Sequence, residues 1–115
     1  MSPECEAKVL SLIGLGVRGR MVVVGVEQVR QAAIRGRLAY AVLATGASRH
    51  SRDKVVPLLT AKRIPFIDGP DAARLGAAVG KESTAAVGIV DRDLARGIRG
   101  AAESSSAGLN RRKRF

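Results

Sequence analysis

Two continuous apolar stretches constrain the fold of this chain more than any other feature. Tyr40–Ala44 and Ala85–Val90 contain no charged residue and are bounded by polar or glycine-containing segments. A strand with one face in water alternates apolar and polar residues, so continuous runs are typical of strands covered on both faces. We therefore expect a sheet with helices on each side.

Segments with helical spacing of apolar residues separate these runs. They predict helices over residues 3–17, 26–35 and 54–63, a fourth that begins at Asp68-Gly69-Pro70-Asp71 and stops at Gly80, and a fifth that Asp91 caps and that ends at about Arg99. Met21–Val24 and Ile64–Ile67 supply two shorter strands. This alternation favours the α/β class, as a three-layer α/β/α sandwich with a central four-stranded mixed sheet.

The composition changes near the C-terminus. From Ala101 onward the chain is rich in serine and then in arginine and lysine, a composition that cannot bury a core. We therefore predict one domain over residues 1–100 and a disordered basic tail over residues 101–115. Two interpretations of the tail stay open, a nonspecific RNA anchor and a solvated segment without a partner.

The chain is strongly basic. Lysine and arginine number 20 against 10 acidic residues, and 15 of the 20 are arginine, the side chain best suited to bidentate contact with phosphate. A polyanionic partner is the leading inference. The alternative is a basic surface that only contributes solubility and nonspecific attraction.

Cysteine and histidine usage excludes several kinds of site. Cys5 is the single cysteine and His50 the single histidine, so neither an internal disulfide nor a transition-metal site is expected. No apolar run approaches the roughly 20 residues of a membrane-spanning helix, and Glu4 and Glu6 stand where a secretory signal is basic. We expect a cytoplasmic protein without metal, cofactor or membrane contact.

The segment Gly14–Gly19 matches the pattern G-x-G-x-x-G of dinucleotide-binding turns. That turn requires a following helix of about ten residues and an acidic residue about 20 positions further on. Here the strand-like run Met21–Val24 follows at once, and residues 33–43 contain no acid. A nucleotide-using enzyme built on this segment is kept as a competing hypothesis, which predicts thermal stabilisation by a dinucleotide.

A second cluster contains the residue types of a hydrolytic triad: Ser48, His50, Ser51 and Asp53. All four lie within six positions of a predicted loop and helix start, where capping and solvation explain them better than catalysis. With no other catalytic constellation in the chain, we do not expect an enzyme.

The start of the second predicted helix is the best candidate for contact with RNA. Gly25 precedes Val26, and Glu27, Gln28, Gln31 and Arg35 share the outward face of a helical wheel. Free amides at a helix N-terminus attract phosphate. Aromatic platforms for base stacking are absent, because the folded part contains only Tyr40 and Phe66. The alternative is an ordinary solvated helix face.

Four segments carry a resemblance to a known family: Gly25–Gly36, Ala41–Ala44, Ile64–Pro65 and Leu75–Gly80. In this order and spacing they resemble the kink-turn-binding ribosomal protein superfamily, and the resemblance runs from about Leu12 to Ile98. Leu12–Leu15 and Val87–Asp91 look most like its bacterial YlxQ-like branch.

The resemblance implies an α/β/α sandwich that binds a kinked RNA helix with tandem G·A pairs. It implies that Gly25 allows close approach of the backbone, that Glu27 and Gln28 stand where the family's guanine-reading Asn and Glu lie, and that Gln31 stands where a Lys is usual. Glu27 thereby lacks an amide donor and Gln31 lacks a cation, for which Arg30 and Arg35 can compensate.

The resemblance also implies a second contact. Thr45 takes the place of a loop acid, and Lys81, Glu82, Ser83 and Thr84 form the loop that in the family packs under an extruded base. The predicted RNA-binding residues are Gly25, Val26, Glu27, Gln28, Arg30, Gln31, Arg35, Thr45, Lys81, Glu82, Ser83 and Thr84.

The resulting hypothesis is a monomeric, non-enzymatic RNA-binding protein of the ribosomal-protein type, acting in translation or ribosome assembly on structured, kink-turn-like RNA, with ribosomal RNA as the expected partner. The alternative is a protein-interaction module on the same scaffold from which RNA contact has been lost.

Overall fold

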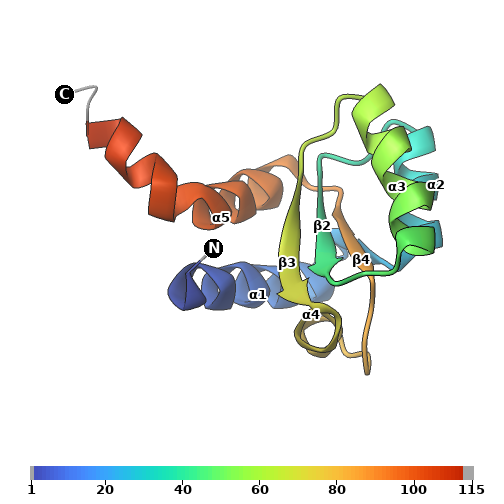
Figure 1. The fold of residues 1–115 in the computed structure, drawn as a ribbon, viewed down its shortest axis with the longest axis horizontal. Coiled ribbons are helices and arrows are strands. Elements are labelled where there is room, and N and C mark those ends of the chain that lie inside the picture. Colours follow the sequence, from blue (N-terminus) through green and yellow to red (C-terminus); the bar gives the residue numbers. More distant parts are fainter. Residues whose placement is uncertain (1, 113–115) are drawn as a thin grey trace.

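Helices and strands alternate along the whole described chain, as predicted (Figure 1). The computed structural model describes residues 2–112, and the side chains of residues 2–103. The elements are α1 (Pro3–Arg18), β1 (Val22–Val24), α2 (Val26–Ile34), β2 (Tyr40–Thr45), α3 (Arg49–Ala61), β3 (Phe66–Asp71), α4 (Ala72–Ala78), β4 (Ala86–Ile89) and α5 (Arg92–Arg112).

The strands form one four-stranded mixed sheet in the order β1-β4-β2-β3. β2 pairs with β3 in parallel, whereas β4 runs antiparallel to both β1 and β2. β1, β2 and β3 therefore all run in one direction. We call the edge where these three strands end and β4 begins the carboxyl edge, and the edge where they begin and β4 ends the amino edge.

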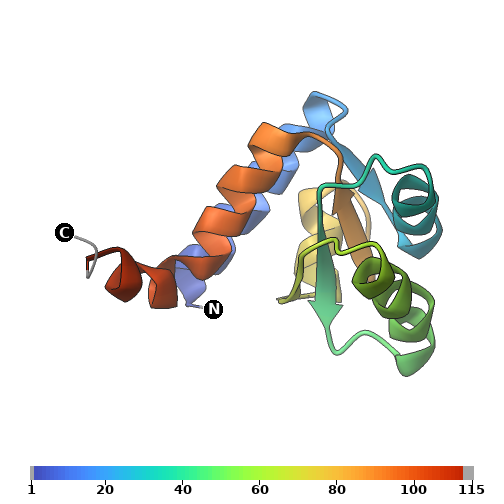
Figure 2. The ribbon, with the colours of Figure 1, turned by 90° about the horizontal axis from the view of Figure 1, so that it is seen from above.

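Helices cover both faces of the sheet, which confirms the three-layer α/β/α sandwich (Figure 2). Successive residues of β2 point to opposite faces. Val42 packs with α1, α4 and α5, whereas Leu43 packs with α2 and α3. Both side chains are almost fully buried, which explains the uninterrupted apolar run. Burial of each such side chain contributes about 1.5–3 kcal/mol to the stability of the fold.

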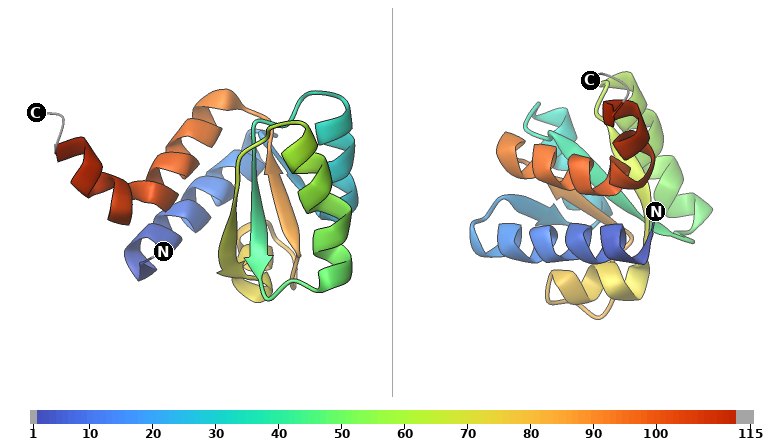
Figure 3. Two further views of the ribbon diagram at one scale, coloured as in Figure 1. Left: turned by 45° about the horizontal axis from the view of Figure 1, so that its top comes forward. Right: turned by 90° about the vertical axis from the view of Figure 1, so that its left-hand side faces the viewer.

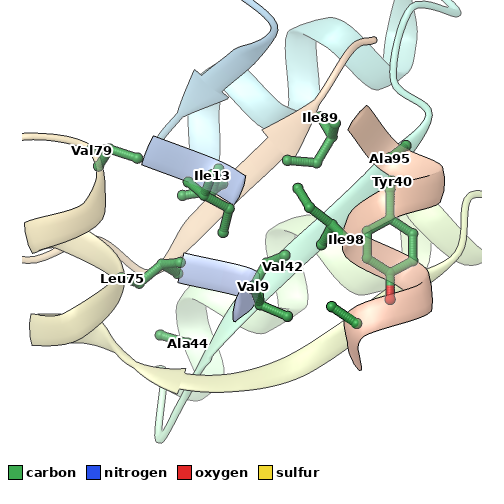
Figure 4. Packing of buried hydrophobic residues seen from close by; sticks show 12 residues of the cluster. Val9, Ile13, Tyr40, Val42, Ala44, Leu75, Val79, Ile89, Ala95 and Ile98 are labelled. Atoms are coloured by element: carbon green, nitrogen blue, oxygen red, sulfur yellow. The ribbon is translucent and has the colours of Figure 1, made fainter. Parts of the chain in front are cut away.

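The larger of the two cores lies between the sheet and the layer of α1, α4 and α5 (Figure 4). Val9 and Ile13 of α1 lie between Leu75 of α4 and Ile98 of α5, and all four are fully buried. The spacing of Val9 and Ile13 is that of neighbours on one helix face, so α1 presents a single apolar stripe to the sheet.

The third helix starts five residues earlier than predicted, at Arg49 instead of Lys54. The Oγ of Ser48 accepts a hydrogen bond from the backbone N–H of Ser51 at 3.1 Å and caps the helix. Pro57 consequently lies inside α3 and not in its first turn.

The prediction that Pro70 begins the fourth helix is wrong. Residues 68–71 belong to β3, and α4 begins at Ala72, where Asp71 Oδ1 accepts a hydrogen bond from the backbone N–H of Arg74 at 2.8 Å. β3 is the outer strand next to β2, where a proline without an N–H leaves no ladder bond unmade.

The fifth helix begins as predicted but ends later. Asp91 Oδ2 accepts a hydrogen bond from the N–H of Leu94 at 2.8 Å, which confirms the cap. The helix then continues to Arg112 instead of ending near Arg99, and Ala101 is only 4% exposed. Ala101 lies three residues after Ile98 on the buried face, so the folded part extends beyond residue 100. Residues 113–115 of the predicted tail lie outside the described residues.

Candidate nucleic-acid interface

The turn at Gly25 leads from β1 into α2 with space around it. Gly25 has φ +97° and ψ 155°, a conformation that residues with a Cβ rarely adopt. A Cβ built at this position would meet nothing within 4 Å. The backbone N–H of Gly25 donates to the carbonyl of Ala86 at 2.8 Å, which fixes the turn. Another molecule can therefore come close to the backbone here.

The N-terminus of α2 has no side-chain cap, which distinguishes it from the other four helices of the described chain. Ser2, Ser48, Asp71 and Asp91 each accept a hydrogen bond from an amide in the first turn of their own helix. Gly25 has no side chain to do so. The first amides of α2 point along the axis with their partial positive charge and suit an acceptor from another molecule.

The second predicted contact, Lys81–Thr84, forms a loop held against α4. The backbone N–H of Lys81 donates to Gly76 at 2.8 Å and that of Thr84 to Ala72 at 3.1 Å. A Cβ at Gly76 would lie 2.4 Å from the Cα of Ser83, so only glycine allows the loop to pack this closely. Lys81, Glu82 and Ser83 are exposed, and Thr84 is half-buried.

A single carbonyl joins this loop to the start of α2. The oxygen of Ala86 accepts the backbone N–H of Gly25 at 2.8 Å and the Oγ1–H of Thr84 at 3.1 Å. Thr45 is also near, because its neighbour Ala44 donates to the carbonyl of Ala85 at 2.9 Å. The structure thus brings the helix start, the second loop and Thr45 together at the carboxyl edge.

Three predicted RNA-binding residues lie further along α2, at increasing distance from its start. Arg30 is half-buried, and its Nη1 donates to the carbonyl of Lys54 at 2.6 Å, which holds it against α3. Gln31 is exposed on the next turn. Arg35 caps the far end of the helix, about 13 Å from its start at 1.5 Å per residue. It therefore lies at the amino edge, away from the other candidates.

The start of α3 adds residues that the sequence did not assign to the interface. Arg49, His50 and Arg52 lie in the first turn at the carboxyl edge. Arg52 pairs with Asp68, and this hydrogen bond raises the pKa of the guanidinium. Recognising Ser48 as a helix cap would have placed these side chains beside α2.

Charge is balanced at the carboxyl edge. Six cations and six acids lie at it, counting the ion pair of Arg74 with Glu6: Arg30, Arg49, Arg52, Lys54, Arg74 and Lys81, and Glu6, Glu27, Asp53, Asp68, Asp71 and Glu82. The strong positive charge of the chain is therefore not concentrated around Gly25. A molecule that binds at this edge would therefore be held by hydrogen bonds to the open backbone and to individual side chains, and not by a concentrated positive charge.

The glycine-rich segment Gly14–Gly19 does not form a dinucleotide-binding turn. Gly14 and Gly16 lie within α1, and a Cβ at Gly16 would come within 2.3 Å of the Leu94 side chain. Gly16 therefore allows α1 to pack closely against α5, whereas a Cβ at Gly14 would make an ordinary contact of 3.5 Å with the carbonyl oxygen of Ala78. The required order of strand, turn and helix is absent at this point.

Among the described residues, no group of three or more His, Cys, Asp and Glu is arranged to hold a metal ion. Within the same residues, no helix combines the length and apolar character that crossing a bilayer requires.

The fold and the carboxyl edge together define a class of small α/β/α sandwich proteins that present an uncapped helix start beside a second loop. Within that class, the chain belongs to the ribosomal protein L7Ae/L30e/S12e/Gadd45 family, whose sequence profile matches residues 7–97. This confirms the predicted superfamily. Its YlxQ-like branch stays a prediction.

Two solved structures illustrate the similarity. A protein of unknown function from Bacillus halodurans is 31% identical, with a TM-score of 0.80, and the match covers 85% of this chain and 99% of the other. The 15.5kD RNA binding protein of Giardia lamblia is 18% identical, with a TM-score of 0.74 and coverage of 93% and 92%, and this likeness concerns the fold. No curated protein sequence matches significantly.

Proposed function

We propose that the chain is a non-enzymatic RNA-binding protein of the ribosomal-protein type, and that it binds structured, kink-turn-like RNA at its carboxyl edge. The observation that carries the proposal is the uncapped start of α2 behind Gly25, in open space beside the second loop. Membership of a ribosomal protein family supports it, as does the similar fold of a Giardia protein described as RNA-binding.

The geometry supports the following roles at the helix start. Gly25 admits an RNA strand to the backbone, and the amides of Val26, Glu27 and Gln28 face it as donors. The exposed side chains of Glu27 and Gln28 contact base edges. Arg30 has five guanidinium donors and uses one on Lys54, so others can contact phosphate.

The second loop provides a separate contact. Lys81–Ser83 are exposed, and the loop is anchored at both ends by hydrogen bonds to α4. A loop prepared in this way loses little conformational freedom when RNA packs against it. Thr45 and Gln31 line the margins of the interface, whereas Arg35 belongs to the opposite edge.

The biological setting that we propose is the ribosome. Ribosomal RNA is the partner, in translation or ribosome assembly, and the protein acts as a cytoplasmic monomer of the YlxQ-like branch. Two residues favour the alternative, a protein-interaction module. Glu27 and Gln31 stand where the family resemblance implies an amide donor and a cation, and both are less favourable to RNA contact.

A gel-shift comparison of kink-turn RNA with a plain duplex of equal length tests the proposal. Gly25→Val places a branched side chain in the open space, and we expect it to reduce the preference for kink-turn RNA at least about tenfold, equivalent to ~1.4 kcal/mol. Gly36→Val is the matched control, because Gly36 also has positive φ, +71°, and open surroundings but lies beyond the other end of α2.

The control variant should keep the preference. If the unaltered protein binds both RNAs equally, the proposed recognition is refuted and the protein-interaction alternative is favoured.

A further inference from the structure

The amino edge brings together four connections that are distant in the sequence. In the sheet register, Ile89 lies opposite both Val22 and Tyr40. Hydrogen bonds then tie the flanking residues: Val90 N donates to Met21 O at 2.8 Å, and Ala41 N to Pro65 O at 3.2 Å. The residues before β1, β2 and β3 and those after β4 consequently form one surface, at the top of the sheet in Figure 3, left.

This surface carries most of the positive charge of the domain. Its nine cations are all exposed: Arg18, Arg20, Arg35, Arg37, Lys62, Arg63, Arg92, Arg96 and Arg99. Three carboxylates accompany them, Asp91, Asp93 and Glu103, and Asp91 is already engaged as the cap of α5. The carboxyl edge, by comparison, has equal numbers of cations and acids.

Most of these cations take no part in holding the fold together. Arg96 pairs with Asp93 at 3.4 Å and Arg99 with Glu103 at 3.1 Å. The other seven make no ion pair with any residue that the structure describes. Clustered like charges repel one another, and a bound polyanion would neutralise them. Binding would therefore relieve a repulsion that is present in the free protein.

The surface also has a shape that suits phosphate groups. Two hollows of about 520 and 230 Å³ open on it, and Tyr40 and Arg99 line both. Arg63 contributes to the larger hollow, and Arg92 and Arg96 to the smaller. The larger hollow is thus lined by arginines from two segments, Arg63 after α3 and Arg99 of α5, together with Glu103, whereas the arginines of the smaller hollow all belong to α5. Arginine binds phosphate oxygens in a bidentate manner.

We propose that the amino edge is a second RNA-binding surface, which contacts the phosphate backbone of the RNA without reading its sequence. This inference rests on the proposed function, because it assigns a second contact to the same partner. A six-residue strand spans roughly 20 Å, so the two edges contact different segments of one folded RNA. The carboxyl edge recognises the RNA, and the amino edge adds salt-dependent affinity.

The test reverses charge at three amino-edge residues without disturbing the fold. Arg37→Glu, Lys62→Glu and Arg92→Glu are combined, since all three side chains are exposed and form no ion pair with described residues. Binding to kink-turn and plain duplex RNA is measured at several salt concentrations. We expect both affinities to fall by the same factor, and the slope of log K against log salt to decrease by about 2 to 3.

A single-residue comparison separates position from overall charge. Arg37→Glu and Lys8→Glu each reverse one exposed cation, but Lys8 lies on α1 away from both edges. Arg37→Glu should weaken duplex binding and Lys8→Glu should leave it nearly unchanged. Equal effects, or an unchanged salt slope in the triple variant, would overturn the second surface.

The outcomes distinguish this inference from the proposed function. Loss of kink-turn preference only in Gly25→Val, with the triple variant binding as the unaltered protein does, refutes the second surface and leaves the proposed function intact. If instead the triple variant binds duplex RNA more weakly and the unaltered protein shows no kink-turn preference, the second surface is supported and the proposed recognition of kink-turn RNA is refuted. Binding of phosphatidylserine vesicles through the same three residues, without RNA binding, would refute the assignment to RNA.

Discussion

Gly76 is the residue on which the second loop depends most. A Cβ there would lie 2.4 Å from the Cα and 2.7 Å from the N of Ser83, and backbone atoms cannot move aside as the end of a flexible side chain can. We predict that Gly76→Ala lowers the free energy of unfolding by about 1–3 kcal/mol. Urea denaturation measures this value.

A second glycine provides a control, because its replacement by alanine should raise the stability of the protein. Gly97 lies inside α5, and a Cβ there would make an ordinary contact of 3.8 Å with Leu12. Gly97→Ala should therefore stabilise the protein by about 0.5–1 kcal/mol, because alanine favours the helix. Similar effects of the two substitutions would contradict the packing described for Gly76.

Tyr40 makes the free energy of unfolding depend on pH at high pH. Burial, and then the negative charge of Glu103, raise the pKa of its phenol to about 12, against about 10 in an unfolded chain. The folded state therefore favours the protonated form, and this stabilisation is complete below pH 10 and is lost between pH 10 and 12. Because Tyr40 is the only tyrosine and tryptophan is absent, tyrosinate absorbance follows its titration directly.

The Tyr40→Phe variant completes this test. The hydroxyl is buried without a hydrogen-bond partner among the described residues, so its removal should not lower stability at neutral pH. The loss of stability between pH 10 and 12 should become smaller. A phenol that titrates near 10 while the protein is still folded would show that Tyr40 is not buried as described.

At the level of single residues, the sequence predicted the neighbourhood of Gly25 but not the position of Arg35. The glycine before a helix with outward polar residues indicated an open N-terminus, and the structure has one there. A helical wheel shows which residues share a face but not how far apart they lie along the axis. For that reason Arg35 was grouped with Gln28 although it lies at the other edge.

The elements themselves were predicted best where packing is simplest. β2 and β4 are buried on both faces, and a continuous apolar run is a clear signal for such strands. β3 extends through Pro70 because it is an outer strand, a position that local sequence does not reveal. The end of α5 was missed because alanine is compatible both with a tail and with a helix packed against α1.

The length of α5 leads to a prediction about its buried face. Ala101 is 4% exposed, whereas its neighbour Gly100 is exposed, and a Cβ at Gly100 would meet nothing within 4 Å. Ala101→Asp should cost about 2–4 kcal/mol of stability because it buries a polar group without a prepared partner. Gly100→Asp should change the stability little. Thermal unfolding of both variants checks this, and equal stabilities would place residue 101 outside the folded domain.

For the whole molecule, the two edges of one sheet differ in character. The carboxyl edge is electrically balanced and presents open backbone, whereas the amino edge is rich in arginine. Composition indicated a polyanionic partner but could not locate the charge. Only the register of all four strands brings Arg20, Arg37, Lys62 and Arg92 to the same edge of the sheet, and no local pattern in the sequence encodes this register.

The most direct test of the central claim is to follow the backbone amides by NMR while kink-turn RNA is added. We predict that the largest shifts occur at Gly25–Gln28 and Lys81–Thr84, with smaller, salt-sensitive shifts at the amino edge. Shifts confined to the amino edge, or equal changes with a plain duplex, would contradict recognition of the RNA by the open start of α2.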